Sequence, residues 1–217
     1  MIEYVKHAMR DLAFRFNNEG ELAQLLLTSK IENTIRDNLM LSLNNLFQIN
    51  NNEHIAVREV KRFDTVIFEK NETISNNDAR LIIELKAMYS FDTLFGPMDF
   101  IEGLIKDICK FKKNQRNFPN AKLLLILLGH HILDDVNPAS LTIKYSSSIH
   151  QSFNQKDSEN DILISCNRIL KEQIQINNIG KIKEQNRIIG GTGLHDIRAD
   201  LLYWIISPNM EYNCNNY

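Results

Sequence analysis

The sequence has little cysteine, no long apolar run and no N-terminal apolar core of the kind found in signal peptides. Its three cysteines, Cys109, Cys166 and Cys214, are far apart and include no CxxC pair. A disulfide framework or a zinc site is therefore not expected. Because no stretch approaches the roughly 18 apolar residues that a membrane helix needs, we expect a cytoplasmic protein with no membrane association.

Excess positive charge is also missing, since 25 Lys and Arg residues face 27 Asp and Glu residues. Proteins that bind nucleic acid by overall electrostatic attraction tend to be strongly basic, so any such site here must be a local basic patch. The 43% hydrophobic and 24% charged content over 217 residues is typical of a globular protein. We expect one domain over residues 1–217, with a disordered Asn-rich tail at 211–217.

The first half of the chain changes from helical to strand periodicity. Apolar residues at three- and four-residue steps predict helices over 3–17 and 20–48, and Ser29 to Glu32 fits a capping box that would restart the second helix. Residues 54–68 predict two short strands or one bent strand, 71–78 a polar turn, and 80–89 a further strand. Together these segments indicate an antiparallel meander.

The second half predicts a helix that Pro97 opens and that ends in the basic segment 110–116. The continuous apolar run 122–129 then indicates a buried strand parallel to the strand at 80–89. A strand at 141–145, a helix from Ser158 to about 177 and a strand pair over 180–206 around Gly190–Gly193 are also expected. This order predicts an α/β fold with a mixed central sheet and helices on both faces.

The strand at 80–89 carries two charged side chains at an unusual place. Because side chains alternate across a strand, Glu84 and Lys86 share one face, whereas Leu81, Ile83 and Leu85 share the other. A charge on a largely buried strand needs a partner or a function. The plainer alternative is that Glu84 and Lys86 form a cross-strand charge pair on a solvated face.

Asp64 lies on the preceding strand. If residues near 68 pair with residues near 80 across the turn, Asp64 comes close to Glu84. Two carboxylates held together repel each other and bind a hard divalent cation, so we expect Mg²⁺ there, with Mn²⁺ as a substitute.

An Asp on one strand, about twenty residues of hairpin and then Glu84-Leu85-Lys86 resembles the PD-(D/E)xK, or restriction-endonuclease-like, nuclease superfamily over roughly residues 20–130. The resemblance implies an αβββαβ core followed by a C-terminal helix and strand pair. It implies that Asp64, Glu84 and the carbonyl of Leu85 bind the metal and that Lys86 is the catalytic lysine. Phe63 stands where the motif has its proline, a position at which the family often departs from the motif.

The same resemblance maps the family's helix carboxylate onto Glu32, or less well onto Glu21. The alternative for Glu32 is the capping box described above. The implied activity is Mg²⁺-dependent hydrolysis of DNA, as a restriction-type or defence endonuclease that acts as a homodimer, and RNA stays open as a substrate. The alternatives are a catalytically silent nuclease fold that binds nucleic acid or a partner, and a ribonuclease.

Basic side chains near these positions are candidates for nucleic-acid contacts, namely Arg62, Lys112, Lys113 and Arg116. A solvated helix end, where cations suit the helix dipole, is the alternative for the last three.

Other polar groups have simpler explanations. The spacing of His130 and His131 to the following acidic pair fits no metal template, and a polar loop is expected there. Residues 190–193 lack the lysine of a phosphate-binding loop and predict a hairpin turn, beside which His195 and Asp196 could line a cleft. Tyr203 and Trp204 alternate along a strand, so at least one of them belongs in the core.

Overall fold

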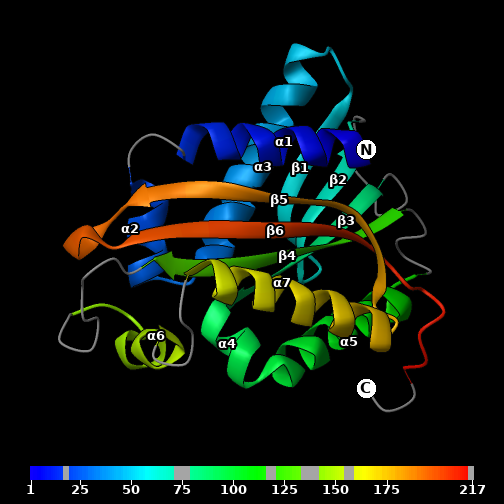
Figure 1. Ribbon diagram of the computed structural model, residues 1–217. Helices are drawn as coiled ribbons and strands as arrows, with labels where there is room; N and C mark the ends of the chain where they lie inside the picture. Colours follow the sequence, from blue (N-terminus) through cyan, green and yellow to red (C-terminus); the bar gives the residue numbers. More distant parts are fainter. Residues whose placement is uncertain (17–19, 71–78, 116–120, 133–141, 154–158, 215–217) are drawn as a thin grey trace.

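The computed structural model of the chain describes residues 1–16, 20–70, 79–115, 121–132, 142–153 and 159–214. Helices cover both faces of one six-stranded sheet, whose strand order is β1-β2-β3-β4-β6-β5 (Figure 1). Strands β1, β2 and β3 form an antiparallel meander, β3 pairs parallel with β4, and β6 pairs antiparallel with both β4 and β5. The expected α/β fold with a mixed central sheet is thus confirmed.

The elements have the following bounds. The strands are β1 (His54–Val60), β2 (Phe63–Glu69), β3 (Ala79–Tyr89), β4 (Ala121–Ile132), β5 (Gly180–Thr192) and β6 (Arg198–Pro208). The helices are α1 (Ile2–Phe16), α2 (Glu21–Thr28), α3 (Ile31–Ile49), α4 (Ser90–Phe95), α5 (Pro97–Lys113), α6 (Ser146–Phe153) and α7 (Glu159–Ile176), and a short 3₁₀ turn, Leu194–Asp196, joins β5 to β6.

Two hydrophobic cores lie on the two faces of the sheet. Strand β4 contributes to both, because Leu123, Leu125 and Leu127 pack with α1, α2 and α3, whereas alternate residues such as Leu124 and Ile126 pack with α5 and α7. A strand covered on both faces needs a continuous apolar run, which explains the sequence at 122–129. Both Tyr203 and Trp204 are fully buried, one in each core.

Most expected elements are confirmed: the helix at 3–17, the two-strand reading of 54–68, the strand at 80–89, the helix from Pro97, the parallel strand, the helix ending near 177 and the final strand pair. The expected strand at 141–145 is wrong where it can be compared, because residues 142–145 form bends and turns ahead of α6. The expected polar turn at 71–78 falls outside the described residues.

The capping box at Ser29 is also wrong. Ser29 is the C-cap of α2, and its Oγ donates a hydrogen bond to the carbonyl of Leu25. Helix α3 begins after Lys30, without a side-chain cap at its N-terminus. Glu32 is therefore not tied to Ser29, and its carboxylate is available to a different partner.

His130 and His131 do not form a polar loop. They continue β4 opposite Asp200 and Ala199 of β6, and both are buried. His131 stacks on Tyr89 with ring centroids 5.6 Å apart. These histidines therefore belong to the interior of the sheet, and the acidic pair after them falls outside the described residues.

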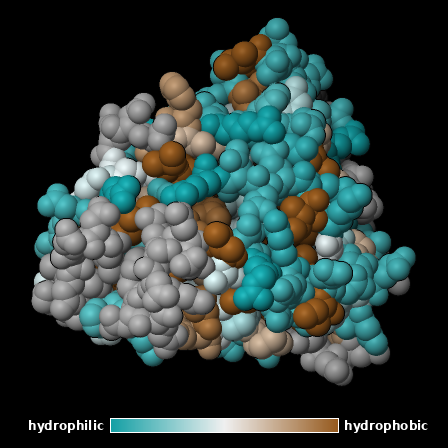
Figure 2. All heavy atoms as spheres, in the orientation of Figure 1, coloured by the Kyte–Doolittle hydropathy of each residue, from teal (hydrophilic) through white to brown (hydrophobic). Residues whose placement is uncertain are grey.

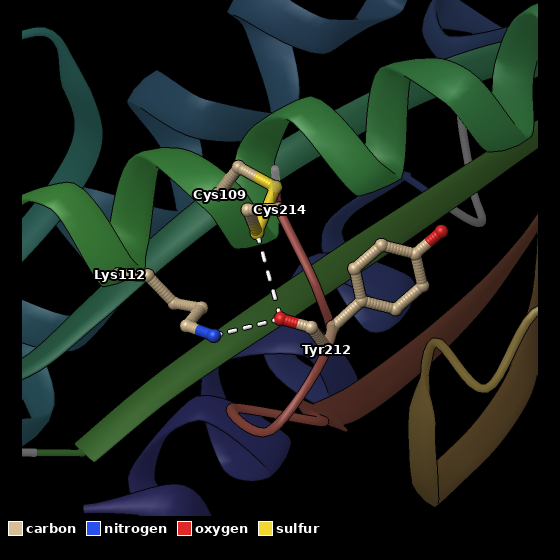
Figure 3. Close-up of a disulfide and its surroundings, with 4 residues drawn as sticks. All are labelled: Cys109, Lys112, Tyr212 and Cys214. Atoms are coloured by element: carbon tan, nitrogen blue, oxygen red, sulfur yellow. Dashed lines mark hydrogen bonds between the residues drawn. A yellow bond between two sulfur atoms is a disulfide. The ribbon is translucent and has the colours of Figure 1, made fainter. Parts of the chain in front are cut away.

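The C-terminal segment corrects the prediction that the chain has no disulfide. Cys109 of α5 and Cys214 form a disulfide across a sequence separation of 105 residues (Figure 3). Lys112 donates a hydrogen bond to the Tyr212 carbonyl at 2.7 Å, so residues 211–214 are held against α5 rather than disordered. Residues 215–217 fall outside the described part. Cys166 is buried, as expected of a core cysteine.

The exposed apolar side chains are dispersed. On the face shown in Figure 2 they form small groups among hydrophilic residues. None of the helices in the described segments is long and apolar enough to cross a membrane. Because disulfides are rare in the reducing cytosol, the Cys109–Cys214 bond does not support the cytoplasmic location, which stays a prediction.

Candidate active site

The register of β2 and β3 brings Asp64 next to Glu84. Thr65 pairs with Ile83 and Phe68 with Ala79, across a bulge between Ile67 and Phe68. This agrees with the pairing expected from the sequence. The pairing of β3 with β2 ends at Ile83, so from Leu85 onward β3 has an edge that β2 does not cover.

Three carboxylates cap this edge of β3. The N–H groups that point outward belong to alternate residues, as the strand period requires. Each donates to one carboxylate: Leu85 N to Asp64 Oδ2 at 2.8 Å, Ala87 N to Glu32 Oε2 at 2.9 Å, and Tyr89 N to Asp92 Oδ2 at 2.9 Å. The carboxylates therefore replace a neighbouring strand, and each keeps a second oxygen for another partner.

Glu84 is the most enclosed acid of the group, with 4% of its surface exposed. Burial, followed by a hydrogen bond with Asp64, raises the pKa of Glu84 to about 9, although Lys110 acts in the opposite direction. Lys110 Nζ donates to Glu84 Oε1 and to the carbonyl of Arg62, and it lies 4.7 Å from the centre of the Phe63 ring. The expected alternative, a charge pair on a solvated face, is wrong for Glu84.

Lys86 lies on the same face of β3 as Glu84 and runs along α5. Its Nζ is 3.8 Å from Asp107 Oδ2. A Cβ added at Gly103 would lie 2.6 Å from Lys86 Cε, so the missing side chain at Gly103 leaves room for the lysine. Helix α5 therefore positions the Lys86 side chain in two ways: Gly103 leaves space for it, and the Asp107 carboxylate attracts its ammonium group.

Asp107 interacts electrostatically with both lysines, Lys86 and Lys110, and with nearby acids. Burial, the largest cause, raises the pKa of Asp107 to about 6, and Lys86 and Lys110 oppose this effect. Asp64 and Glu32 raise the pKa further, which shows that both lie within electrostatic reach of Asp107. The sequence-predicted residues Asp64, Glu84, Lys86 and Glu32 are therefore brought into one cluster.

The part of the chain that is described contains no group of three or more His, Cys, Asp or Glu residues that could hold a metal ion, so any cation here would have few protein ligands. Mg²⁺ keeps several waters and needs only one or two carboxylates. Asp64 and Glu84 supply two carboxylates, and Asp64 contributes to the raised pKa of Glu84. In a strand the N–H and C=O of a residue point the same way, so the Leu85 carbonyl faces the edge where Asp64 caps its N–H. These residues fit Mg²⁺.

Two cavities flank the cluster. The first, of about 600 Å³, includes Lys86 and Phe95 in its lining and reaches α6. The second, of about 570 Å³, lies between the β1–β2 turn and α5 and is lined almost wholly by basic side chains: Lys61, Arg62, Lys106, Lys110 and Lys113, with Cys109 and Asn114. A smaller cavity of about 200 Å³ adjoins Glu32 and Ala87.

The candidate nucleic-acid residues separate into three groups. Arg62 and Lys113 both line the basic cavity. Lys112 instead donates its hydrogen bond to Tyr212, so it belongs to the attachment of the C-terminal segment. Arg116 falls outside the described residues. His195 and Asp196 are exposed in the 3₁₀ turn between β5 and β6, and Glu21 begins α2 as an exposed residue.

The sequence analysis missed three residues that shape the site. Gly103, Asp107 and Lys110 follow one another at steps of four and three, so they lie along one side of α5. That spacing was visible in the sequence beside the apolar face of the same helix. It did not show that this side of α5 would lie over Glu84 and Lys86, because that depends on how α5 packs on the sheet.

Comparison of the chain with known protein families, with curated proteins and with solved structures finds no match.

Proposed function

We propose that this chain is a Mg²⁺-dependent nuclease with a restriction-endonuclease-like core, which hydrolyses phosphodiester bonds at the Asp64–Glu84–Lys86 cluster. The observation that carries the proposal is that Asp64 of β2 accepts a hydrogen bond from Leu85 N and so lies beside Glu84 of β3, with Lys86 two residues further along the same strand face.

Asp64 and Glu84 would hold the cation, together with the Leu85 carbonyl. A bound Mg²⁺ would stabilise charge on the phosphate and lower the pKa of a coordinated water. Lys86 places an ammonium near the same oxygens, with Asp107 fixing its direction. Lys110 places a second positive charge beside Glu84. While no cation is bound, this charge offsets part of the negative charge of the carboxylates in the cluster.

The basic cavity supports a nucleic acid as the substrate. Five cationic side chains line a volume of about 570 Å³, and one of them, Lys110, also contacts Glu84. Phosphates of a polynucleotide can therefore bind beside the cluster, although the net charge of the whole chain is −2. Because the chain as a whole is not basic, a nucleic-acid site has to be a local basic patch, and this cavity is such a patch.

The test is cleavage of supercoiled plasmid DNA, and of a labelled RNA, with Mg²⁺ or Mn²⁺. Asp64→Asn is the sharpest variant, because asparagine keeps an oxygen for Leu85 N and an amide that can donate to Glu84, yet removes the charge. Lys86→Met keeps the apolar stem of the lysine. Lys183→Ala, at an exposed position of β5, is the matched control.

We expect both site variants to lose at least 100-fold in cleavage rate while their melting temperatures stay within a few degrees of the wild type, and Lys183→Ala to cleave normally. Undiminished cleavage by both site variants would mean that other residues carry the reaction. The competing proposal, a silent nuclease fold, requires that the wild type bind DNA or RNA but cleave neither with either metal.

The restriction-type or defence role and the homodimer belong to the same proposal. Cleavage of both strands of a duplex by one kind of site favours two copies related by two-fold symmetry. Light scattering of the purified chain, alone and with a DNA duplex, tests this part directly.

A further inference from the structure

The cavity beside Lys86 differs in chemistry from the basic cavity on the other side of the cluster. Its wall includes four apolar side chains, those of Met88, Phe91, Phe95 and Phe100. Phe95 lines this open cavity of about 600 Å³ and keeps 43% of its surface exposed. An exposed ring at the edge of a cavity offers a stacking surface for a flat ligand.

The charged groups of this cavity exclude a phosphate as its main occupant. Besides Lys86, which lies at the cluster end, its lining carries the carboxylates of Asp92 and Asp99. Ser148 and Gln151 of α6 complete the polar part of the lining. These groups accept or exchange hydrogen bonds with the amino and ring N–H groups of a neutral heterocycle, whereas the carboxylates repel an anion.

Lys86 belongs both to this cavity and to the proposed catalytic cluster. A phosphodiester that binds at Lys86 therefore brings one of its flanking nucleotides to the mouth of the cavity. In a continuous duplex that nucleotide is stacked and paired, so its base cannot enter. Only an unpaired or extruded base can reach Phe95.

We infer that the cavity beside Lys86 binds an unpaired or extruded nucleobase, which stacks on Phe95, and that the substrate presents such a nucleotide, in a single strand or flipped out of a duplex, next to the cleaved phosphodiester. The inference rests on the proposed nuclease function and specifies its substrate class. The basic cavity at Lys110 binds the phosphates on one side of the cluster, and the aromatic cavity binds a base on the other side.

The test is binding without hydrolysis, measured in EDTA by fluorescence anisotropy of a labelled 16-nucleotide single strand and of the same strand in a duplex. Phe95→Ala removes the ring, and Phe95→Trp keeps a stacking surface. Phe14→Ala is the matched control, because Phe14 is a 75% exposed phenylalanine on α1. Because Phe14 is 75% exposed and Phe95 43% exposed, neither alanine variant is expected to unfold, and thermal melting verifies this.

We expect the wild type to bind the single strand at least 10-fold more tightly than the duplex. Phe95→Ala should weaken single-strand binding by about 5- to 150-fold and leave duplex binding unchanged, since the stacking of one base on an aromatic ring has this range of effect. Phe95→Trp and Phe14→Ala should bind as the wild type does. Equal binding of single strand and duplex, or no loss with Phe95→Ala, would overturn the inference.

The two proposals fail in different ways. If no metal supports cleavage but Phe95→Ala still weakens single-strand binding, the base-binding cavity stands and the nuclease function falls. If Asp64→Asn abolishes cleavage while Phe95→Ala binds and cleaves like the wild type, the nuclease function stands and the base-binding cavity falls. Repeating the binding series with an RNA strand separates the two sugars as substrates.

Discussion

Lys86 of β3 passes Gly103 of α5 so closely that a Cβ on the glycine would stand 2.6 Å from Lys86 Cε and 3.2 Å from its Nζ. A glycine in a helix interior costs up to about 1 kcal/mol relative to alanine. The chain therefore carries a local loss of helix stability at a position where a larger residue would displace the candidate catalytic lysine.

Gly103→Ala should lower nuclease activity without lowering stability. We expect the variant to melt at the same or a slightly higher temperature, because α5 gains helix propensity, while nuclease activity falls about 10- to 100-fold because Lys86 Nζ is displaced. Thermal melting and cleavage kinetics measured on the same preparation provide the readout. Glu102→Ala, at the exposed neighbouring position, should leave cleavage unchanged; a similar loss there would show that α5 is merely sensitive to substitution.

Glu32→Gln distinguishes edge capping from a role in the reaction. The glutamine keeps an amide oxygen for Ala87 N, so the edge of β3 stays capped and stability should change by less than about 1 kcal/mol. If the Glu32 carboxylate contributes to the metal site, the Mg²⁺ concentration needed for half-maximal cleavage should rise several-fold. Glu32→Ala loses the cap as well and should also be less stable. Unchanged Mg²⁺ dependence in Glu32→Gln would assign Glu32 to edge capping alone.

Without metal, the free energy of unfolding should change with pH because of Glu84. Its folded-state pKa of about 9 lies above the ordinary value of 4.5, so between these limits the folded state binds more protons than the unfolded state. The contribution of Glu84 to stability is then fully present below pH 4.5 and decreases as pH rises toward 9, by up to about 1.4 kcal/mol per pH unit. Urea unfolding in EDTA at pH 6, 7 and 8 should show this slope.

Glu84→Gln removes the titrating group and should flatten the slope, so that the variant gains on the wild type as pH rises. Parallel curves for the two proteins would show that Glu84 is already ionised in the folded chain. Added Mg²⁺ should stabilise the wild type more than Glu84→Gln, because only the wild type offers both carboxylates.

The sequence predicted those features that depend on local periodicity. The alternation of Leu81, Ile83 and Leu85 with Glu84 and Lys86 is a property of any strand, and it correctly placed the two charges on one face. The pairing of Asp64 with Glu84 followed from the two strands and the short segment between them.

Other features depend on contacts between distant segments and were missed for that reason. Lys110 reaches Glu84 only because α5 packs across β3, and Cys109 meets Cys214 only because the chain returns to α5 after β6. His130 and His131 continue β4 because β6 pairs with them, which no signal in their own segment indicates. Local sequence patterns therefore predicted which residues share a strand face and how neighbouring strands pair. Contacts between segments that are distant in the sequence were visible only in the tertiary structure.

The Cys109–Cys214 bond should stabilise the fold by restricting the unfolded chain. A loop of about 100 residues corresponds to a loss of chain entropy worth up to about 4.7 kcal/mol, and measured effects are typically 2–4 kcal/mol. We therefore expect Cys214→Ser to melt several degrees below the oxidised wild type. Dithiothreitol should lower the wild type to the same temperature and leave the variant unchanged. Detection of three reactive thiols in the untreated, unfolded wild type would show that the bond does not form.

The buried histidines should make the chain sensitive to mild acid. Burial, the largest cause, lowers the pKa of His131 to about 4 despite its hydrogen bond with the Leu26 carbonyl, and the pKa of His130 is lowered to about 3. Below the ordinary value of 6.5 the unfolded state therefore binds protons that the folded state does not. The contribution of these histidines to stability is fully present above pH 6.5 and is lost as pH falls toward 4, so acidification from pH 7 to 5 should cost about 2 kcal/mol for His131 alone.

His131→Gln tests this contribution, because the amide can still donate to the Leu26 carbonyl but does not titrate. The variant loses the imidazole that stacks on Tyr89, so it should be less stable than the wild type at pH 7. Its further loss between pH 7 and pH 5 should nevertheless be smaller than that of the wild type by about 2 kcal/mol in urea unfolding. An equal loss in His131→Gln and the wild type would mean that His131 is already protonated, or exposed to solvent, in the folded chain.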